Sequence, residues 1–350
     1  MLRPFLYKQH KIYRFQAFVN HVFLEIICRA PKLKSRYPTF PFGLVAPKYN
    51  PILEEVNQEY IKNPLCAIYE VARDLLPESI KTLRRAVVLN NRIEELCKGE
   101  AEPVLYSDLE KIDNPEKTLT THIKILCKHL YNEVMDRASF THTYGKLNAY
   151  YKFIMGRTDV CKCCGLTSVL NAYNAPRDAF DHYLPRDKYP FVAVNFRNLV
   201  PACYHCNSSY KHTQDTLHYD PQRADQPRRE RRTKAFYPFR KDSPDIRISL
   251  SLSPGCLVKK LKLRDFTLQI ESPTHPDEVK NWQRLYGIEE RYKGYYCSES
   301  LSNFYEEQYL AKMIHGKSAA EYIQDLQKSK FYDCNFLKIP LIRALNPDEE

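Results

Sequence analysis

Four cysteines at regular spacing are the residues of this chain best suited to chemistry. They form two Cys-x-x-Cys pairs, Cys161 with Cys164 and Cys203 with Cys206. Each pair can present two thiolates to one tetrahedral Zn²⁺ at ~2.3 Å, so the two pairs together make a closed four-sulfur structural site. Cys163 could replace a member of the first pair, but only Cys161 with Cys164 has the two-residue gap. The spacing therefore predicts structural zinc.

An Asp-His step and an Asn accompany these pairs. Asp181-His182 lies between the pairs, and Asn207 follows the last cysteine directly. Hydrolysis of a phosphodiester needs an activated water and a cation that neutralises charge on the phosphate. Histidine, with an ordinary pKa of ~6.5, can take a proton at cellular pH. A carboxylate and an amide oxygen suit Mg²⁺ or Mn²⁺ better than zinc. These residues predict a second, catalytic metal site beside a general base.

The order of the two acid–base residues constrains how they can work. If Asp181 and His182 lie on one strand, their side chains point to opposite faces. Pro185, just beyond, favours a strand end or a bend at this point. Such a bend would let both side chains reach one phosphate.

The segment from Val160 to Lys211 resembles the HNH endonucleases, also called the ββα-metal nucleases, in their zinc-stabilised form. The resemblance is carried by Asp181-His182, by Leu199-Val200-Pro201 leading into Cys-x-x-Cys-Asn, and by the lysine that ends the segment. It implies a zinc-bound ββα module and hydrolysis of phosphodiester bonds with 5′-phosphate and 3′-hydroxyl products. The expected substrate is nucleic acid, with DNA favoured and RNA left open.

The resemblance also implies a role for each motif residue. His182 would be the general base, and Asp181 and Asn207 would hold the catalytic Mg²⁺ or Mn²⁺. A middle asparagine would brace the hairpin loop. Asn198 is the first candidate for that brace, and Asn195 competes with it. The last metal ligand is Asn where the family name has His, which is a common variant in the family.

Two other interpretations stay open at the level of sequence. The four cysteines alone are typical of non-catalytic zinc modules that bind nucleic acid or protein within a larger complex. That interpretation requires the Asp-His and Asn positions to be coincidental. In addition, accessory HNH proteins often resemble effectors of bacterial anti-phage systems, which suggests a nuclease acting with a partner protein of a defence complex.

The charge of the chain favours a polyanionic partner. Lys plus Arg number 53 against 42 Asp plus Glu, a net charge of +11. Eight basic residues against two acids lie between Gln222 and Lys241, directly after the motif. Because phosphate contacts are made mainly by basic side chains, we predict backbone contacts here. The predicted nucleic-acid-binding residues are Lys211, Arg228, Arg229, Arg231 and Arg232.

The elements around the motif predict an α+β chain in three parts. Residues 1–145 read as a mainly helical region, residues 146–220 as the zinc-bound HNH module, and residues 221–350 as a basic segment followed by an α+β region. Helical spacing runs from Pro77 to Lys98, and a further helix is predicted from Lys146 to Met155. Alternation from Ile246 to Leu252 and from Phe266 to Ile270 predicts a hairpin. The residues after Lys328 read as an irregular tail.

The cysteines and the hydropathy of the chain indicate which cellular compartment to expect. The eight cysteines outside the zinc pairs are scattered and read as reduced, small apolar residues, which indicates the cytosol. Lys8, Lys11 and Arg14 interrupt the early apolar residues, so a secretory signal is not expected. No apolar stretch of 18 residues occurs, so we expect a cytoplasmic protein without a membrane span.

Overall fold

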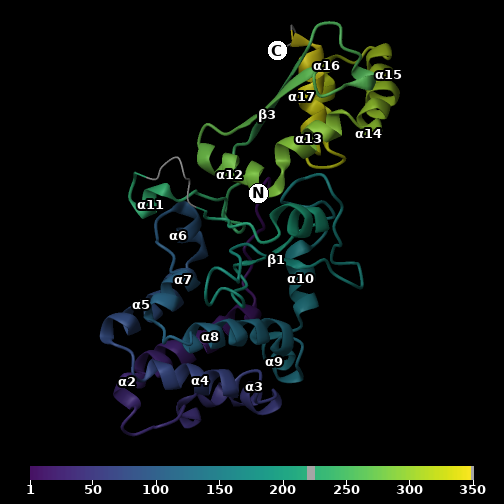
Figure 1. Ribbon diagram of the computed structural model, residues 1–350. Helices are drawn as coiled ribbons and strands as arrows, with labels where there is room; N and C mark the ends of the chain where they lie inside the picture. Colours follow the sequence, from purple (N-terminus) through teal and green to yellow (C-terminus); the bar gives the residue numbers. More distant parts are fainter. Residues whose placement is uncertain (219–224, 348–350) are drawn as a thin grey trace.

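The structure, a computed structural model, describes residues 1–218 and 225–347. Helices dominate, and two small two-stranded sheets accompany them, so the α+β prediction is confirmed. Figure 1 shows the N-terminal helices at one end, the C-terminal helices at the other, and β1 with its surroundings between them. Within the described residues, no helix is long and apolar enough to cross a membrane.

The N-terminal region is built from short helices around a common core. α4 and α8 pack against each other through buried residues that recur at helical spacing, among them Leu65, Ile68, Ile123 and Leu126. The helices of this region are α1 (Gln16–His21), α2 (Ala30–Leu33), α3 (Asn50–Glu55), α4 (Lys62–Ala72), α5 (Pro77–Asn90), α6 (Ile93–Lys98), α7 (Tyr106–Leu109), α8 (Thr118–His129) and α9 (Ala138–Tyr144).

The helix predicted from Pro77 to Lys98 is divided in two. α5 ends at Asn90, whose buried side chain donates to the carbonyl oxygens of Val104 at 2.7 Å and Pro190 at 3.1 Å. These bonds tie the helix end to two loops and stop it there, an effect of tertiary structure that local spacing does not reveal. The second helix, α6, ends at Lys98, and Gly99 caps it in the left-handed conformation at φ 78°.

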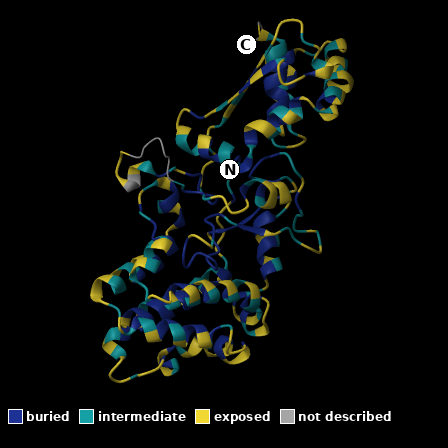
Figure 2. Cartoon of the chain, viewed as in Figure 1, coloured by how far each residue is buried: buried dark blue, intermediate teal, exposed yellow. Residues whose placement is uncertain are grey.

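The central part has the order strand, strand, helix. α10 (Leu147–Met155) precedes β1 (Phe180–His182), which pairs antiparallel with β2 (Leu199–Pro201), so that His182 faces Leu199 in the register. A π-helix, η8 (His205–Lys211), follows. Figure 2 shows mostly buried residues along β1, β2 and the inner side of α10. The helix expected from Lys146 to Met155 is confirmed.

The C-terminal region begins with the predicted hairpin. β3 (Arg247–Leu252) pairs antiparallel with β4 (Phe266–Glu271), which confirms the alternation. The tail is not irregular, because α17 buries eight of its eleven residues, a correction to the sequence prediction. The helices here are α11 (Arg228–Arg231), α12 (Pro276–Tyr286), α13 (Ile288–Tyr296), α14 (Glu299–Asn303), α15 (Leu310–Ile314), α16 (Ala319–Lys328) and α17 (Asn335–Leu345).

Candidate metal centre and active site

The four predicted zinc ligands meet at one buried point. The sulfur atoms of Cys161, Cys164, Cys203 and Cys206 all lie within 4.8 Å of one another. The Cys161 and Cys206 sulfurs are 3.9 Å apart, close to the ~3.8 Å edge of a tetrahedron with Zn–S bonds of ~2.3 Å. Backbone N–H groups of Cys203 and Cys206 approach the sulfurs of Cys161 and Cys203 at 3.4 Å each. The cluster therefore fits a zinc ion, and the Cys163 sulfur is not part of it.

The C-terminal helices hold the cluster from outside. Arg291 of α13 donates to the sulfurs of Cys206 at 3.2 Å and Cys164 at 3.3 Å. Trp282 of α12 donates to the carbonyl oxygen of Cys163 at 2.7 Å. Burial lowers the pKa of Arg291, but the neighbouring Cys164 and Cys206 raise it more, so the pKa lies above its ordinary value. A four-thiolate zinc centre carries net negative charge, and this guanidinium offsets part of it.

Sequence reasoning missed Arg291, and the sequence carries no local signal for it. The residue stands 85 positions after Cys206, on a helix with no recognisable motif. Only the tertiary packing of α13 against the two cysteine pairs brings it there.

Asp181 and Lys211 form a buried ion pair. The Lys211 Nζ lies 2.8 Å from Asp181 Oδ1 and 2.9 Å from the His182 carbonyl oxygen. Their side chains are only 1% and 3% exposed, for Lys211 and Asp181 respectively. Asp181 Oδ2 is buried, and among the described residues it has no hydrogen-bond partner. Burial raises the pKa of Asp181, and this effect exceeds the lowering by Lys211.

This pair corrects the prediction for Lys211. A lysine near the end of a surface helix was expected to reach a phosphate, but η8 turns the side chain inward to Asp181. The Lys211 ammonium therefore pairs with a buried carboxylate and is not accessible to a ligand. It also occupies one of the two carboxylate oxygens expected to bind the catalytic metal, and Oδ2 remains as the oxygen that could do so.

His182 lies on the opposite face of β1 from Asp181, as strand alternation requires. Its Nε2 is 3.0 Å from the carbonyl oxygen of Ala193, in the loop between β1 and β2. Because a carbonyl oxygen only accepts, Nε2 carries the proton of the neutral ring, and Nδ1 keeps a lone pair. Burial first, and then the charge of Arg186, lower the pKa of His182 to about 3. The ring is therefore neutral at cellular pH, with Nδ1 as its acceptor nitrogen, and the burial that lowers its pKa also makes it a weaker base than an exposed histidine.

The two candidate asparagines have different surroundings. Asn198 is fully buried and spans the β1–β2 loop: its Oδ1 accepts from the Leu184 N–H at 2.7 Å, and its Nδ2 donates to the Leu184 carbonyl at 2.9 Å. Asn195 instead donates to the Asn91 side chain at 2.9 Å and so ties the loop to the end of α5. The bracing geometry expected of the middle asparagine occurs at Asn198.

Asn207 is the third residue of η8. It is half-buried, and its backbone N–H donates to the Cys203 carbonyl oxygen at 2.9 Å. In the part of the chain that the structure describes, its side chain makes no hydrogen bond. Lys211, one turn further along this helix, contacts Asp181, so the Asp181–Lys211 pair ties the end of the helix to β1.

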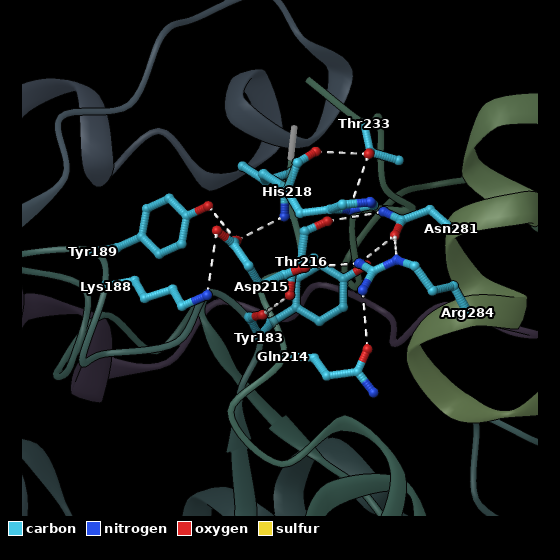
Figure 3. A network of polar contacts seen from close by, with 11 residues as sticks. Tyr183, Lys188, Tyr189, Gln214, Asp215, Thr216, His218, Thr233, Asn281 and Arg284 are labelled. Carbon is cyan, nitrogen blue, oxygen red and sulfur yellow. Dashed lines mark hydrogen bonds and ion pairs between the residues drawn. The ribbon is translucent and has the colours of Figure 1, made fainter. Parts of the chain in front are cut away.

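The segment after η8 is fixed by the network in Figure 3. The Asp215 side chain accepts from the Tyr189 hydroxyl at 2.5 Å, and its carbonyl oxygen accepts from Arg284 of α12 at 2.7 Å. Asn281 of the same helix donates to the Thr216 carbonyl oxygen at 2.8 Å. The Thr216 hydroxyl in turn donates to the Tyr183 carbonyl oxygen, directly after β1. Helix α12 therefore holds the segment after η8 directly and, through Thr216, the residue that follows β1.

The basic segment is partly turned inward, which corrects a second prediction. Arg232 is buried, donates to the Leu96 carbonyl oxygen at 3.0 Å and pairs with Glu102 at 3.9 Å. It anchors the segment to the end of α6 and is not available to a phosphate. Arg231 is half-buried. The side chains of Arg228 and Arg229 lie outside what the structure describes, and their contact with nucleic acid stays a prediction.

Comparison with known proteins gives one short likeness. Over 36 residues, 10% of this chain, the sequence is 50% identical to the Septu protein PtuB of Bacillus thuringiensis, and the match covers 14% of that protein. The chain thus matches about a seventh of the length of this curated relative. No family model matches the chain, and no solved structure matches it.

Proposed function

We propose that this protein is a metal-dependent endonuclease of the HNH type that hydrolyses phosphodiester bonds of DNA. The observation that carries the proposal is the orientation of His182. Its Nε2 is held by the Ala193 carbonyl, which leaves Nδ1 as the acceptor nitrogen of the neutral ring. The chain order of strand, strand, helix around four clustered cysteines supports the same conclusion.

In the proposed reaction, His182 Nδ1 takes a proton from the water that attacks phosphorus. A new P–O bond forms as the bond to the leaving 3′-oxygen breaks, and that oxygen takes a proton from solvent water to become a hydroxyl; His182 then returns its proton to solvent. Nε2 stays bonded to Ala193, so the ring cannot rotate away from the water. Asn198 keeps the loop that carries this carbonyl in one conformation through its bonds to Leu184.

A catalytic Mg²⁺ or Mn²⁺ fits the residues in part. Asp181 Oδ2 is buried without a partner, and an oxygen in that state can be satisfied by a hard cation. Asp181 and Asn207 are the residues that would hold the ion, which would supply neutralisation of charge at the phosphate. The fit is incomplete, because the Asp181 side chain is 3% exposed and lies on the opposite face of β1 from His182. Zinc, in contrast, would sit in the cysteine cluster and supply folding free energy.

The biological setting that we propose is anti-phage defence, with the protein acting as a nuclease effector beside a partner protein. The short match to the Septu protein PtuB supports this setting. The net charge of +11 supports a nucleic-acid partner.

The test is incubation of the purified protein with supercoiled plasmid, linear duplex, single-stranded DNA and RNA, each with Mg²⁺, Mn²⁺ or EDTA. We expect cleavage of DNA that requires Mg²⁺ or Mn²⁺ and that His182→Ala abolishes, while zinc content and melting temperature stay close to those of the parent. If His182→Ala cleaves as fast as the parent, the activity does not belong to this site. Absence of cleavage with retained nucleic-acid binding would favour a non-catalytic zinc module.

A further inference from the structure

A tyrosine from the N-terminal region covers His182. Tyr131 lies in η7 (Leu130–Val134), a π-helical continuation of α8. Its ring meets the His182 ring edge-on, with centroids 4.6 Å apart and planes at 63°. π-helical turns are rare and occur frequently at functional sites. Tyr131 thereby makes a distant helix part of the wall around the candidate base.

An arginine completes this wall. Arg186 follows His182 by four residues, and its guanidinium carbon lies 5.3 Å from the centre of the Tyr131 ring. Its Nη1 donates to Asn132 Oδ1 at 3.3 Å. The side chain is half-exposed. The contact with the Tyr131 ring and the bond to Asn132 position the guanidinium, and the side chain stays partly accessible to solvent.

The charge of Arg186 is not compensated by a bound carboxylate. Among the described residues, no Asp or Glu oxygen lies within 4.0 Å of its nitrogens. A guanidinium has five N–H donors, and one of them has a protein acceptor here. Arg232 is buried and Arg291 donates to two cysteine sulfurs, so neither side chain is as accessible to a ligand as Arg186. The arginine beside His182 is therefore able to receive an external anion.

We propose that Arg186, positioned by Tyr131 and Asn132, binds a phosphate of the DNA strand next to His182. The inference rests on the proposed function and names a further binding residue of that site. The planar guanidinium can contact two oxygens of one phosphate at once, which a lysine cannot do. The stacking on Tyr131 ties this contact to the base, because the same ring touches both Arg186 and His182.

The test measures binding without cleavage. A fluorescein-labelled 20-base-pair DNA duplex is titrated with His182→Ala protein, and anisotropy is recorded at several salt concentrations. On this background we compare Arg186→Gln, Arg186→Lys and the control Arg85→Gln, an exposed arginine on α5. Melting temperature and zinc content are measured for each variant to show that the fold is kept.

We expect Arg186→Gln to weaken binding roughly tenfold to a hundredfold, and the slope of log affinity against log salt to flatten by about one unit. Arg186→Lys should keep the slope and recover part of the affinity, since it keeps the charge but not the two-point contact. Arg85→Gln should leave both quantities unchanged. A purely structural role would lower the melting temperature without changing the salt slope.

The inference is overturned if Arg186→Gln binds the duplex with the affinity and slope of the control. Binding is read independently of cleavage, so this outcome can occur while the nuclease proposal stands. Conversely, a flattened slope would support the phosphate contact even if the cleavage assay failed. Binding that is lost equally in Arg186→Gln and Arg85→Gln would also contradict a specific contact.

Discussion

Replacing Lys211 by Met should destabilise this protein strongly, because it would leave the Asp181 carboxylate buried without a cation. The two groups are 2.8 Å apart and at most 3% exposed, and Asp181 Oδ2 already lacks a partner. Removing one member of a buried pair costs about 3–5 kcal/mol of the free energy of unfolding. We expect a loss in this range for Lys211→Met, and a similar one for Asp181→Leu, which would leave the ammonium with the His182 carbonyl alone.

The double variant should behave differently. The pKa of Asp181 is raised even though Lys211 lies beside it, so the cost of burying the carboxylate exceeds the gain from the pair. Exchange of both charges for apolar side chains of similar shape is often neutral or stabilising. Asp181→Leu with Lys211→Met should therefore fall within about 1 kcal/mol of the parent, or above it. The coupling between the two sites would then be several kcal/mol.

The assay is urea unfolding of the zinc-loaded variants at pH 7, followed by circular dichroism. Lys293→Met is the matched control, because Lys293 pairs with Glu289 on the surface, and such pairs contribute about 0–1 kcal/mol. A loss for Lys211→Met no larger than that of the control would refute the argument. Additive losses in the double variant would refute the coupling.

Three further results are expected. Cys203→Ser should lose zinc and unfold at lower temperature, as elemental analysis and calorimetry would show; unchanged zinc content would contradict the cluster assignment. Arg291→Met should weaken zinc binding against a chelator, because it removes the charge facing two sulfurs; equal competition would contradict that role. The pKa of His182 is about 3, so only the unfolded chain takes up this proton as pH falls below ~6.5. The free energy of unfolding should therefore decrease as the pH is lowered, by up to ~1.4 kcal/mol per pH unit. His182→Gln should flatten this pH dependence in urea titrations at pH 4–7.

The parts of the site that could be predicted from sequence depend on short spacing. A two-residue gap between cysteines fixes how two sulfurs can meet at one ion, so Cys161, Cys164, Cys203 and Cys206 were placed correctly. The alternation in β3 and β4 has the same local origin. The opposite orientation of Asp181 and His182 follows from strand geometry alone.

The misplaced residues depend on packing between distant segments. Lys211 and Arg232 look like solvated cations in sequence, and each finds a buried acceptor that lies at least 29 positions away. The Asp181 carboxylate is the counter-charge of Lys211 as well as a candidate metal ligand.

The flanking regions have a physical reason to be present, although neither carries a motif. The central strands have three residues each, too few for an independent sheet, and η8 has seven residues. The C-terminal helices stabilise the part of this small module that carries the four cysteines, through Arg291 and the bonds of α12 to the segment after η8. The N-terminal region compensates on the other face, where Tyr131 packs on His182. The zinc centre and the candidate base are therefore stabilised by opposite ends of the chain, so a mutation in either flank can alter the site without touching a ligand or the base.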